Sequence, residues 1–491
     1  MTIPTDSGTV TEDVNYERRW LVLGIVAIAQ LLVIMDGSIV NVALAAAQKD
    51  LGFSDDNRQW VITAYALAAG SLLLLGGRAG DLFGRKRIFL VGLIGFAVAS
   101  AVGGAAPNFE VLVTARAIQG ISSALLAPAA LAIVAVTFTD PEERGKALGV
   151  FGAVAGVGAG VGLLLGGALT DLLSWRWSLY VNIVLAVPVL IAGARLIKAH
   201  HRDRNTGGHT RTLDLPGALT VTGGVFALVF GVSRAETHGW DDVTTVSSLI
   251  VSAVLLVAFV IIEQRVHEPL LPLRVVLNPT RGGSYFAIAI YSVVLFSMYL
   301  FVPFYLQHTL GYSPLRTGLA VIPSNLALVV TVATAAKLLE RFGPRTLITV
   351  GLLAAAAGDV VLAQIGAGSG YLALALPGLI LIGVGGGFLF ATTFATGTFG
   401  VEERDTGVAS ATLNVALQIG GSIGIAVLST VFGTTVGDYL TEHGAEAATL
   451  HGYRVIYWVA AGIAVAGAVI SALLIRARRH QLAAAAAVTM H

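Results

Sequence analysis

The chain alternates long apolar blocks with short polar segments along nearly its whole length. Each block has roughly 20 residues, about the length at which an α-helix crosses the hydrocarbon core of a bilayer. The blocks predict fourteen transmembrane helices, at about 20–47, 59–77, 88–106, 110–136, 147–170, 178–197, 215–233, 244–263, 283–307, 315–336, 347–366, 371–398, 406–435 and 453–475. The pattern therefore predicts an all-α polytopic membrane protein with both termini on one side of the bilayer.

Lysine and arginine are divided unevenly between the two sets of loops. If the N-terminus is cytoplasmic, the segments on that side carry 23 of the 30 basic residues and the external loops carry 6. Cytoplasmic loops of membrane proteins are enriched in Lys and Arg. The distribution therefore predicts that both termini are cytoplasmic.

Two loop sequences recur at nearly the same offset. GRAGDLFGRKR at 77–87 is similar to AKLLERFGPR at 336–345, and PEERGKALG at 141–149 is similar to VEERDTGVA at 401–409. The offsets, 259 and 260, span eight predicted helices, which indicates a duplicated unit with two helices inserted between the copies. Two such halves around a midplane site are a transporter architecture. The predicted segments are a tail at 1–19, a six-helix bundle at 20–199, a linker with helices 7 and 8 at 200–265, a second six-helix bundle at 266–479, and a tail at 480–491.

Composition excludes several classes of protein. Only 12% of the residues are charged and the mean hydropathy is +0.81, whereas a soluble domain carries about 25% charged residues. The net charge of +1 gives no indication of a nucleic-acid partner, and the absence of cysteine excludes disulfides and thiolate metal sites. The chain has neither the Gly-x-x-x-x-Gly-Lys-Ser/Thr spacing of a P-loop nor a His-x-x-x-His pair, so an ATP-driven pump or a membrane enzyme is not supported. No soluble signalling domain is visible, which argues against a sensor.

One carboxylate lies inside the first apolar block. Asp36 occurs in VIMDGSIVNVAL at 33–44, and a charge at the bilayer centre costs about 2.5–3.5 kcal/mol on insertion scales. A buried carboxylate that faces a cavity can exchange a proton near physiological pH. The alternative is a structural ion pair with a basic residue of a neighbouring helix. We expect the first role, because intramembrane acids are rare and usually functional.

Arg116 is the basic residue placed in the middle of a predicted helix. Arginine stays charged at any relevant pH, so we expect it to bind Asp36 or a carbonyl of the first helix. Helical spacing places Arg116, Gln119 and Ser123 on one face. Asp359 is a second acid within an apolar run, and for it we expect a local hydrogen-bonded role rather than a second proton site.

Four motifs resemble those of the major facilitator superfamily, and within it the 14-helix drug/proton antiporter branch. GRAGDLFGRKR resembles the signature loop between helices 2 and 3, MDGSIVNVALA at 35–45 the helix 1 motif, LVTARAIQGISSA at 112–124 the helix 4 motif, and GVFGAVAGVGAGVGLLLGG at 149–167 the helix 5 antiporter motif. The chain departs from these motifs at Ser38, Ala45, Leu82 and Leu163. Leu163 stands where the helix 5 motif has proline, which weakens the argument for antiport.

The resemblance implies roles for particular residues. Arg116 would tune Asp36 and couple its protonation to the conformational switch; the alternative is an ion pair that only stabilises packing. The implied cytoplasmic latch comprises Gly77, Asp81, Gly84, Arg85 and Arg144. The implied hinge or seal of helix 5 comprises Gly158, Gly162, Gly166 and Gly167, although small residues also serve ordinary helix packing.

Polar and aromatic side chains on several predicted helices could contact a flat, partly apolar ligand. The candidates for a substrate cavity are Asn41, Tyr65, Gln119, Tyr305, Asn325, Asn414 and Gln418. For Trp175, Arg176 and Trp177 we expect an interfacial anchor without a substrate role.

Together these features predict a proton-coupled antiporter of the bacterial cytoplasmic membrane that exports an amphipathic drug, antibiotic or toxic small molecule. We expect a monomer driven by the proton gradient, with no cofactor or metal and a lipophilic, cationic or aromatic substrate. The alternative is a proton-coupled symporter that imports a small nutrient.

Overall fold

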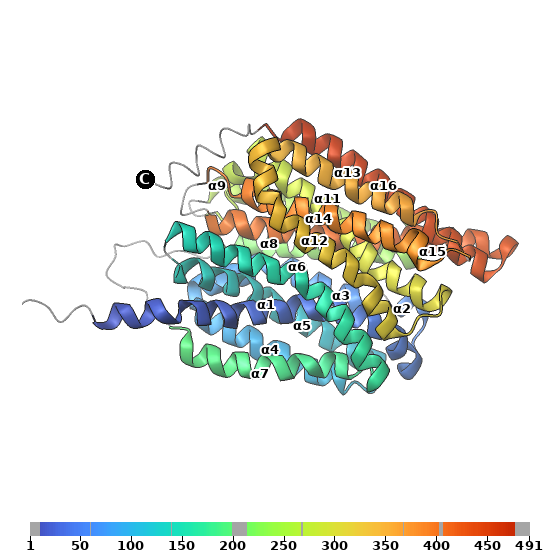
Figure 1. Cartoon of the computed structure of the whole chain (residues 1–491), viewed down its shortest axis with the longest axis horizontal. Helices are drawn as coiled ribbons and strands as arrows, with labels where there is room; N and C mark the ends of the chain where they lie inside the picture. Colours follow the sequence, from blue (N-terminus) through green and yellow to red (C-terminus); the bar gives the residue numbers. More distant parts are fainter. Residues whose placement is uncertain are drawn as a thin grey trace, which may run out of the picture.

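The computed structural model describes residues 10–58, 60–138, 140–198, 214–266, 269–366, 368–401 and 406–476. The described part contains helices and connecting loops (Figure 1). The helices are α1 (Val10–Leu51), α2 (Asp55–Arg58), α3 (Trp60–Phe83), α4 (Arg85–Gly104), α5 (Phe109–Thr137), α6 (Pro141–Leu172), α7 (Trp177–Leu196), α8 (Leu215–His238), α9 (Val243–Arg265), α10 (Leu273–Val276), α11 (Pro279–Phe304), the π-helix η1 (Tyr305–Thr309), α12 (Pro314–Phe342), α13 (Pro344–Leu362), the π-helix η2 (Tyr371–Ala375), α14 (Leu376–Gly397), α15 (Thr406–His443) and α16 (Ala445–Leu474).

Most of the long helices are suited to a membrane. Eleven helices in the described part are long and apolar enough to cross a bilayer. Shorter apolar stretches occur in α3 at 60–73, in α6 at 158–172 and in α8 at 216–232. The prediction of an all-helical membrane protein is confirmed, while the number of fourteen transmembrane helices stays a prediction.

Several helices extend beyond the apolar blocks that predicted them. The Asp140 side chain accepts a hydrogen bond from the backbone N–H of Glu143, and Pro141 occupies the first turn, so α6 begins six residues before the predicted start. α12 ends at Phe342 because Gly343 adopts a φ of 78°, which favours glycine. Hydrophobicity marks only the part of a helix that faces lipid or core, whereas caps determine where the helix begins and ends.

The same helix pairings occur in both halves of the chain. In the first half α1 packs against α6 and α7, and α5 packs against α3 and α4. In the second half α11 packs against α15 and α16, and α14 packs against α12 and α13. The pair α8–α9 lies between these sets in sequence, and α8 contacts both α3 and α15. The pairings follow the order expected for a duplicated unit.

The two halves meet at one end of the molecule. We call the end at which α1 begins the proximal end, on the left in Figure 1, and the opposite end the distal end. Residues of the distal part of α1, such as Ile39 and Leu44, share one hydrophobic core with α11–α16. The proximal part of α1 belongs to a separate core, together with α4, α5 and α7. The halves are therefore joined through apolar side chains at the distal end.

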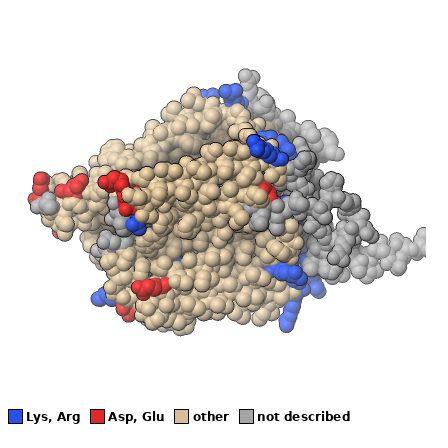
Figure 2. All heavy atoms as spheres, turned by 180° about the vertical axis from the view of Figure 1, so that it is seen from behind, with Lys and Arg blue, Asp and Glu red and all other residues tan. Residues whose placement is uncertain are grey.

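Charged side chains gather at the two ends of the molecule. Figure 2 shows a broad band with few charges, with most of the visible Lys and Arg at the proximal end and most of the visible Asp and Glu at the distal end. A wide uncharged band between two charged ends is what a bilayer requires of a polytopic protein.

Candidate functional site

Asp36 and Arg116 form an ion pair in the interior of the first half. Arg116 Nη1 lies 2.5 Å from Asp36 Oδ2, and the side chains are 1% and 0% exposed. Arg116 also donates through Nε to the backbone carbonyl of Val61 on α3, at 3.2 Å. The predicted pairing of Arg116 with the acid is thus present, and its carbonyl partner belongs to α3 rather than to the first helix. The guanidinium therefore links α5 to both α1 and α3.

Two amide side chains complete the coordination of the carboxylate. Gln119 Nε2 and Asn182 Nδ2 donate to Asp36 Oδ1 at 3.1 and 2.6 Å. Both amides also donate to the Ser100 hydroxyl oxygen, at 2.8 and 3.3 Å. Sequence reasoning identified Gln119 by its helical spacing from Arg116 but missed Asn182 and Ser100. The available signal for Asn182 was its position as a polar residue in the apolar block 178–197.

The guanidinium of Arg116 also lies over an aromatic ring. The carbon of the Arg116 guanidinium lies 4.5 Å from the centre of the Tyr65 ring, within cation–π range. The Tyr65 hydroxyl donates to the Ser123 hydroxyl at 3.1 Å. Tyr65 therefore belongs to the acid–arginine cluster, and Ser123 lies on the same face of α5 as Arg116, as predicted.

The glycines of α6 lie against the part of α1 that carries Asp36. A Cβ added at Gly162 would lie 2.5 Å from the Met35 carbonyl oxygen, and one at Gly166 would lie 2.7 Å from the Ile39 carbonyl oxygen. At Gly158 the nearest atoms belong to Ile34 on the same helix. The distances at Gly162 and Gly166 are shorter than a side chain permits, so glycine is required at these two positions for α1 and α6 to approach this closely. The backbone on both sides of Asp36 is therefore held by α6.

A second face of α6 contacts α12 across the boundary between the halves. A Cβ at Gly167 would lie 2.4 Å from the Pro314 carbonyl oxygen, and one at Gly318 would lie 2.5 Å from the Leu163 carbonyl oxygen. Leu163, which replaces the motif proline, is fully buried in this contact. One helix thus touches both the acid-bearing helix and the other half of the protein.

Polar side chains join the halves beside this contact. Asn41 on α1 donates through Nδ2 to the Tyr299 carbonyl on α11 at 3.2 Å, which joins the halves. Within the second half, the Tyr299 hydroxyl donates to Asn325 Oδ1 on α12 at 2.8 Å. Near the distal end, the Leu315 backbone N–H donates to Asp171 Oδ2 at 3.1 Å. Asn41 and Asn325, predicted as cavity residues, lie where the two halves meet, and their contact with a substrate stays a prediction.

The predicted latch lies at the proximal end of the molecule. Gly84 precedes α4 with a φ of 94°, and Gly343 precedes α13 with a φ of 78°, so both copies of the repeated loop need a residue without a side chain. A Cβ at Gly77 would meet Pro128 at 3.7 Å, which is ordinary contact. Arg85 lies in the first turn of α4. The side chains of Asp81 and Arg144 lie outside the described residues, so their latch role stays a prediction.

The remaining cavity candidates are dispersed over the second half. Tyr305 lies in η1, where its hydroxyl is 3.5 Å from the carbonyl oxygens of Gly366 and Ser369 and its ring packs against Tyr453. It belongs to the distal end, away from the Asp36 cluster. Asn414 and Gln418 lie on α15 and are half-buried. Their contact with a substrate stays a prediction.

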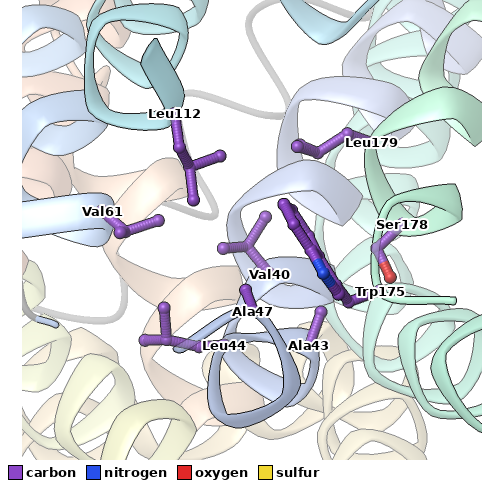
Figure 3. A pocket seen from close by; sticks show the side chains of 9 residues that line it. All are labelled: Val40, Ala43, Leu44, Ala47, Val61, Leu112, Trp175, Ser178 and Leu179. Atoms are coloured by element: carbon purple, nitrogen blue, oxygen red, sulfur yellow. The ribbon is translucent and has the colours of Figure 1, made fainter. Parts of the chain in front are cut away.

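Trp175 lies in the protein interior rather than at the membrane interface where it was expected. It is buried, donates through its indole N–H to Asp50 at 3.0 Å, and covers a small apolar cavity between α1, α3, α5 and α7 (Figure 3). Arg176 Nη2 lies 3.1 Å from the same Asp50 carboxylate. The expectation of an interfacial anchor is therefore wrong for Trp175, while Trp177 is 43% exposed. The cavity has a volume of about 10 Å³, room for about one water molecule, so it is too small for a drug.

Asp359 differs from the expectation of a local hydrogen-bonded acid. It is 0% exposed, and neither carboxyl oxygen has a hydrogen-bond partner among the described residues. The same part of the chain contains no group of three His, Cys, Asp or Glu side chains that could hold a metal ion. Asp359 is therefore a buried acid that needs a separate explanation.

Comparison with known proteins places the chain in a family. The sequence pattern described as Major Facilitator Superfamily matches residues 26–425. The chain is 48% identical over 469 residues to the puromycin resistance protein pur8 of Streptomyces alboniger, covering 94% of this chain and 92% of that protein. It is 38% identical over 408 residues to the cephamycin export protein CmcT of Amycolatopsis lactamdurans, covering 83% of each. It is also 30% identical over 430 residues to the tetracenomycin C resistance and export protein of Streptomyces glaucescens, covering 88% and 79%.

Solved structures show the same fold. A bacterial homologue of the human lysosomal transporter Spinster, described as inward-facing and unoccupied, superposes with a TM-score of 0.64 at 17% identity, covering 93% of this chain and 97% of that one. The human organic anion transporter MFSD10 superposes with a TM-score of 0.60 at 15% identity, covering 93% and 99%. Family match, relatives and fold agree: the chain belongs to the Major Facilitator Superfamily, and it is a membrane transporter rather than an enzyme.

Proposed function

We propose that this transporter is a proton-coupled antiporter that exports an amphipathic antibiotic or toxic small molecule from the cytoplasm. The observation that carries the proposal is the buried Asp36–Arg116 pair, held by two amides, on the helix that packs against the glycines of α6. The relatives named for resistance to puromycin and export of cephamycin support an antibiotic as the cargo.

The proposed proton site is the carboxylate of Asp36. Arrival of a proton at this carboxylate cancels its charge and removes the Coulombic attraction to Arg116, which itself stays charged. The guanidinium keeps its bond to the Val61 carbonyl and its contact with Tyr65. Protonation therefore loosens α1 from α5 while α5 remains attached to α3.

The proposed transmission runs from α1 through α6 to α12. A displacement of α1 near Asp36 meets the backbone of α6 at Gly162 and Gly166, where no side chain separates the helices. The opposite face of α6 contacts α12 at Gly167 and Gly318. Because both contacts are backbone against backbone, a shift on one side cannot be absorbed by a change of rotamer. Movement of α1 thus reaches the boundary between the two bundles.

We place the two bundles at residues 20–199 and 266–479, with α8 and α9 inserted between them and fourteen transmembrane helices in all. The proximal end carries most of the visible basic side chains (Figure 2), which supports a cytoplasmic location for it and for both termini. The shared hydrophobic core at the distal end then corresponds to a closed external side. In this arrangement the cargo would enter from the proximal side. The latch residues Asp81, Arg85 and Arg144 would close that side in the opposite conformation.

The test is substrate-induced proton movement in inside-out vesicles that hold an imposed pH gradient. Puromycin and a panel of lipophilic cations are added to vesicles with the wild type, Asp36→Asn, and the control Asp438→Asn, an exposed acid at the distal end of α15. We expect puromycin to dissipate the gradient in the wild type and in Asp438→Asn. We expect no dissipation above the empty-vesicle rate in Asp36→Asn.

Two outcomes would contradict the proposal. Dissipation that survives Asp36→Asn would remove the assigned proton site. If none of the added compounds dissipates the gradient with the wild type, but the wild type moves protons together with a nutrient into right-side-out vesicles, the protein is a symporter instead.

A further inference from the structure

The second half contains a buried carboxyl group that the proposed Asp36 mechanism does not use. Asp359 lies on α13, is fully buried, and has both oxygens without a hydrogen-bond partner in the described part of the chain. An ionised carboxylate in such surroundings is far more costly than one that is paired or hydrogen-bonded. Nearly all buried polar groups in proteins have a partner, so this exception requires a reason.

The internal repeat relates Asp359 to a residue of the Asp36 cluster. Gly84 and Gly343 begin α4 and α13 with positive φ, and their numbers differ by 259. Farther along the same helices, a Cβ at residue 92 would lie 3.0 Å from a backbone carbonyl of α5, and one at residue 351 would lie 3.0 Å from a backbone carbonyl of α14. The same offset of 259 relates Ser100 to Asp359. The two side chains therefore occupy equivalent places in the two bundles.

The partners available at this place differ between the halves. Ser122 of α5 corresponds to Gly385 of α14, because their carbonyl oxygens make the equivalent packing contacts with α4 and α13. Ile197 corresponds to Ile475, because these residues directly follow the last residues of α7 and α16. In the first half Ser100 accepts hydrogen bonds from Gln119 and Asn182. In these registers Gln119 corresponds to Ile382 and Asn182 to Ala460, which are both apolar and fully buried. In the second half, the acid Asp359 thus lies at a place where apolar residues replace the two hydrogen-bond donors of the first half.

Two tyrosines of neighbouring helices lie near the acid. Tyr291 on α11 and Tyr457 on α16 lie within electrostatic range of Asp359. The Tyr291 hydroxyl donates to a carbonyl of α14 at 3.3 Å, whereas the Tyr457 hydroxyl is buried and has no partner among the described residues. α14 packs closely against the preceding residue, Gly358, where an added Cβ would lie 2.7 Å from Ile382. Arg454 of α16 is occupied elsewhere, because its Nε donates to the Ile365 carbonyl, three residues beyond the end of α13.

We propose that Asp359 is a second proton-binding site, which holds a proton in the conformation described here and for which Tyr457 is the partner when the proton leaves. One proton from the aqueous phase binds a carboxylate oxygen, which removes the charge and turns that oxygen into a donor. On release, the Tyr457 hydroxyl donates to the carboxylate after a local movement of α13 against α16. Two unpaired polar groups of the same region then satisfy each other.

This proposal extends the proposed antiport, and its first test needs no substrate. Infrared spectroscopy of the purified transporter in lipid nanodiscs at neutral pH detects the C=O stretch of a protonated carboxyl group. We expect the band in the wild type and in Asp438→Asn, and its loss in Asp359→Asn. In Tyr457→Phe, which lacks the donor to the ionised form, we expect the band to persist to higher pH than in the wild type. Asparagine has nearly the shape of the neutral acid, so Asp359→Asn should fold with unchanged thermal stability.

A second test counts protons in proteoliposomes with the membrane potential clamped at zero. Each exchanged proton multiplies the steady-state accumulation of puromycin by about tenfold per unit of pH gradient. We expect about 100-fold accumulation per unit for the wild type and about tenfold for Asp359→Asn. Full loss of transport in Asp36→Asn alongside partial loss in Asp359→Asn would separate the two acids.

The two tests distinguish a failure of the second proton site from a failure of the proposed antiport. A carboxyl band that is unchanged in Asp359→Asn, or an accumulation that has the same dependence on pH in both proteins, would overturn the second proton site. If the wild type moves no puromycin, the proposed antiport of this drug fails. The infrared band would then still decide whether Asp359 holds a proton.

Discussion

Removal of the Arg116 guanidinium is the sharpest test of the buried cluster. Arg116→Gln leaves the Asp36 carboxylate fully buried, with only the amides of Gln119 and Asn182 as donors. Loss of one partner of a buried ion pair costs about 3–5 kcal/mol, because the other charge stays uncompensated. Two hydrogen bonds to a charged group offset part of that cost, so we expect a loss of about 3 kcal/mol in the free energy of unfolding.

The reverse substitution should cost less. Asp36→Asn leaves Arg116 with the Val61 carbonyl, the Gln119 amide oxygen and the Tyr65 ring. The double variant Asp36→Asn/Arg116→Gln carries no buried charge, so it should be more stable than the sum of the single effects predicts. We expect a coupling energy of about 2 kcal/mol or more between the two positions.

The assay is denaturant titration in detergent micelles, followed by the fluorescence of the six tryptophans. Arg19 and Glu143 provide a matched control, since they form an ion pair of the same chemistry with side chains 11% and 22% exposed. Both of these side chains reach solvent, so their cycle should give a smaller coupling than that between Asp36 and Arg116. Strictly additive effects of Asp36→Asn and Arg116→Gln would refute the argument, as would an Arg116→Gln variant no less stable than Arg19→Gln.

Three further substitutions probe the contacts around the cluster. Gly162→Ala should destabilise the protein by about 1–3 kcal/mol and slow antiport, because its methyl group meets the α1 backbone. The control Gly37→Ala on α1 meets open space and should leave thermal unfolding unchanged. Tyr299→Phe leaves the Asn325 amide oxygen without its donor and should cost about 1–3 kcal/mol; a melting temperature equal to that of the wild type would contradict this. Gly84→Ala imposes a side chain at a φ of 94° and should cost about 1–3 kcal/mol, and equal melting temperatures for variant and wild type would contradict this.

Hydropathy and helical spacing predicted much of the cluster, because both signals are local. Asp36 and Arg116 stand out as charges within apolar blocks, and Gln119 follows from its spacing on the same helix face. Asn182 and Ser100 did not stand out, because a single amide or hydroxyl on an apolar helix has no preferred partner until the helices are placed. The bundle brings α7 and α5 to the carboxylate of α1, and α4 to the two amides that bind it.

The roles of the α6 glycines and of Asp359 depended even more on the arrangement of helices. Small residues every four positions predict close packing without naming the neighbour. In the fold Gly162 packs against α1 and Gly167 packs against α12, so α6 links the helix of Asp36 to the second half. Asp359 was expected to form a local hydrogen bond, but neither of its carboxyl oxygens has a partner in the described part of the chain.

The sequence by itself determined the helical membrane character, the internal repeat and the two charges at the centre of the first half. These follow from the length of apolar blocks and from the cost of burying charge, which act along the chain. The tertiary structure alone decided which helix faces meet, that Asn41 and Asn325 lie between the halves, and that the distal end is joined by a shared core. Helices in a bilayer are all apolar on the outside, so their partners are selected by shape and a few hydrogen bonds, which only the folded chain brings together.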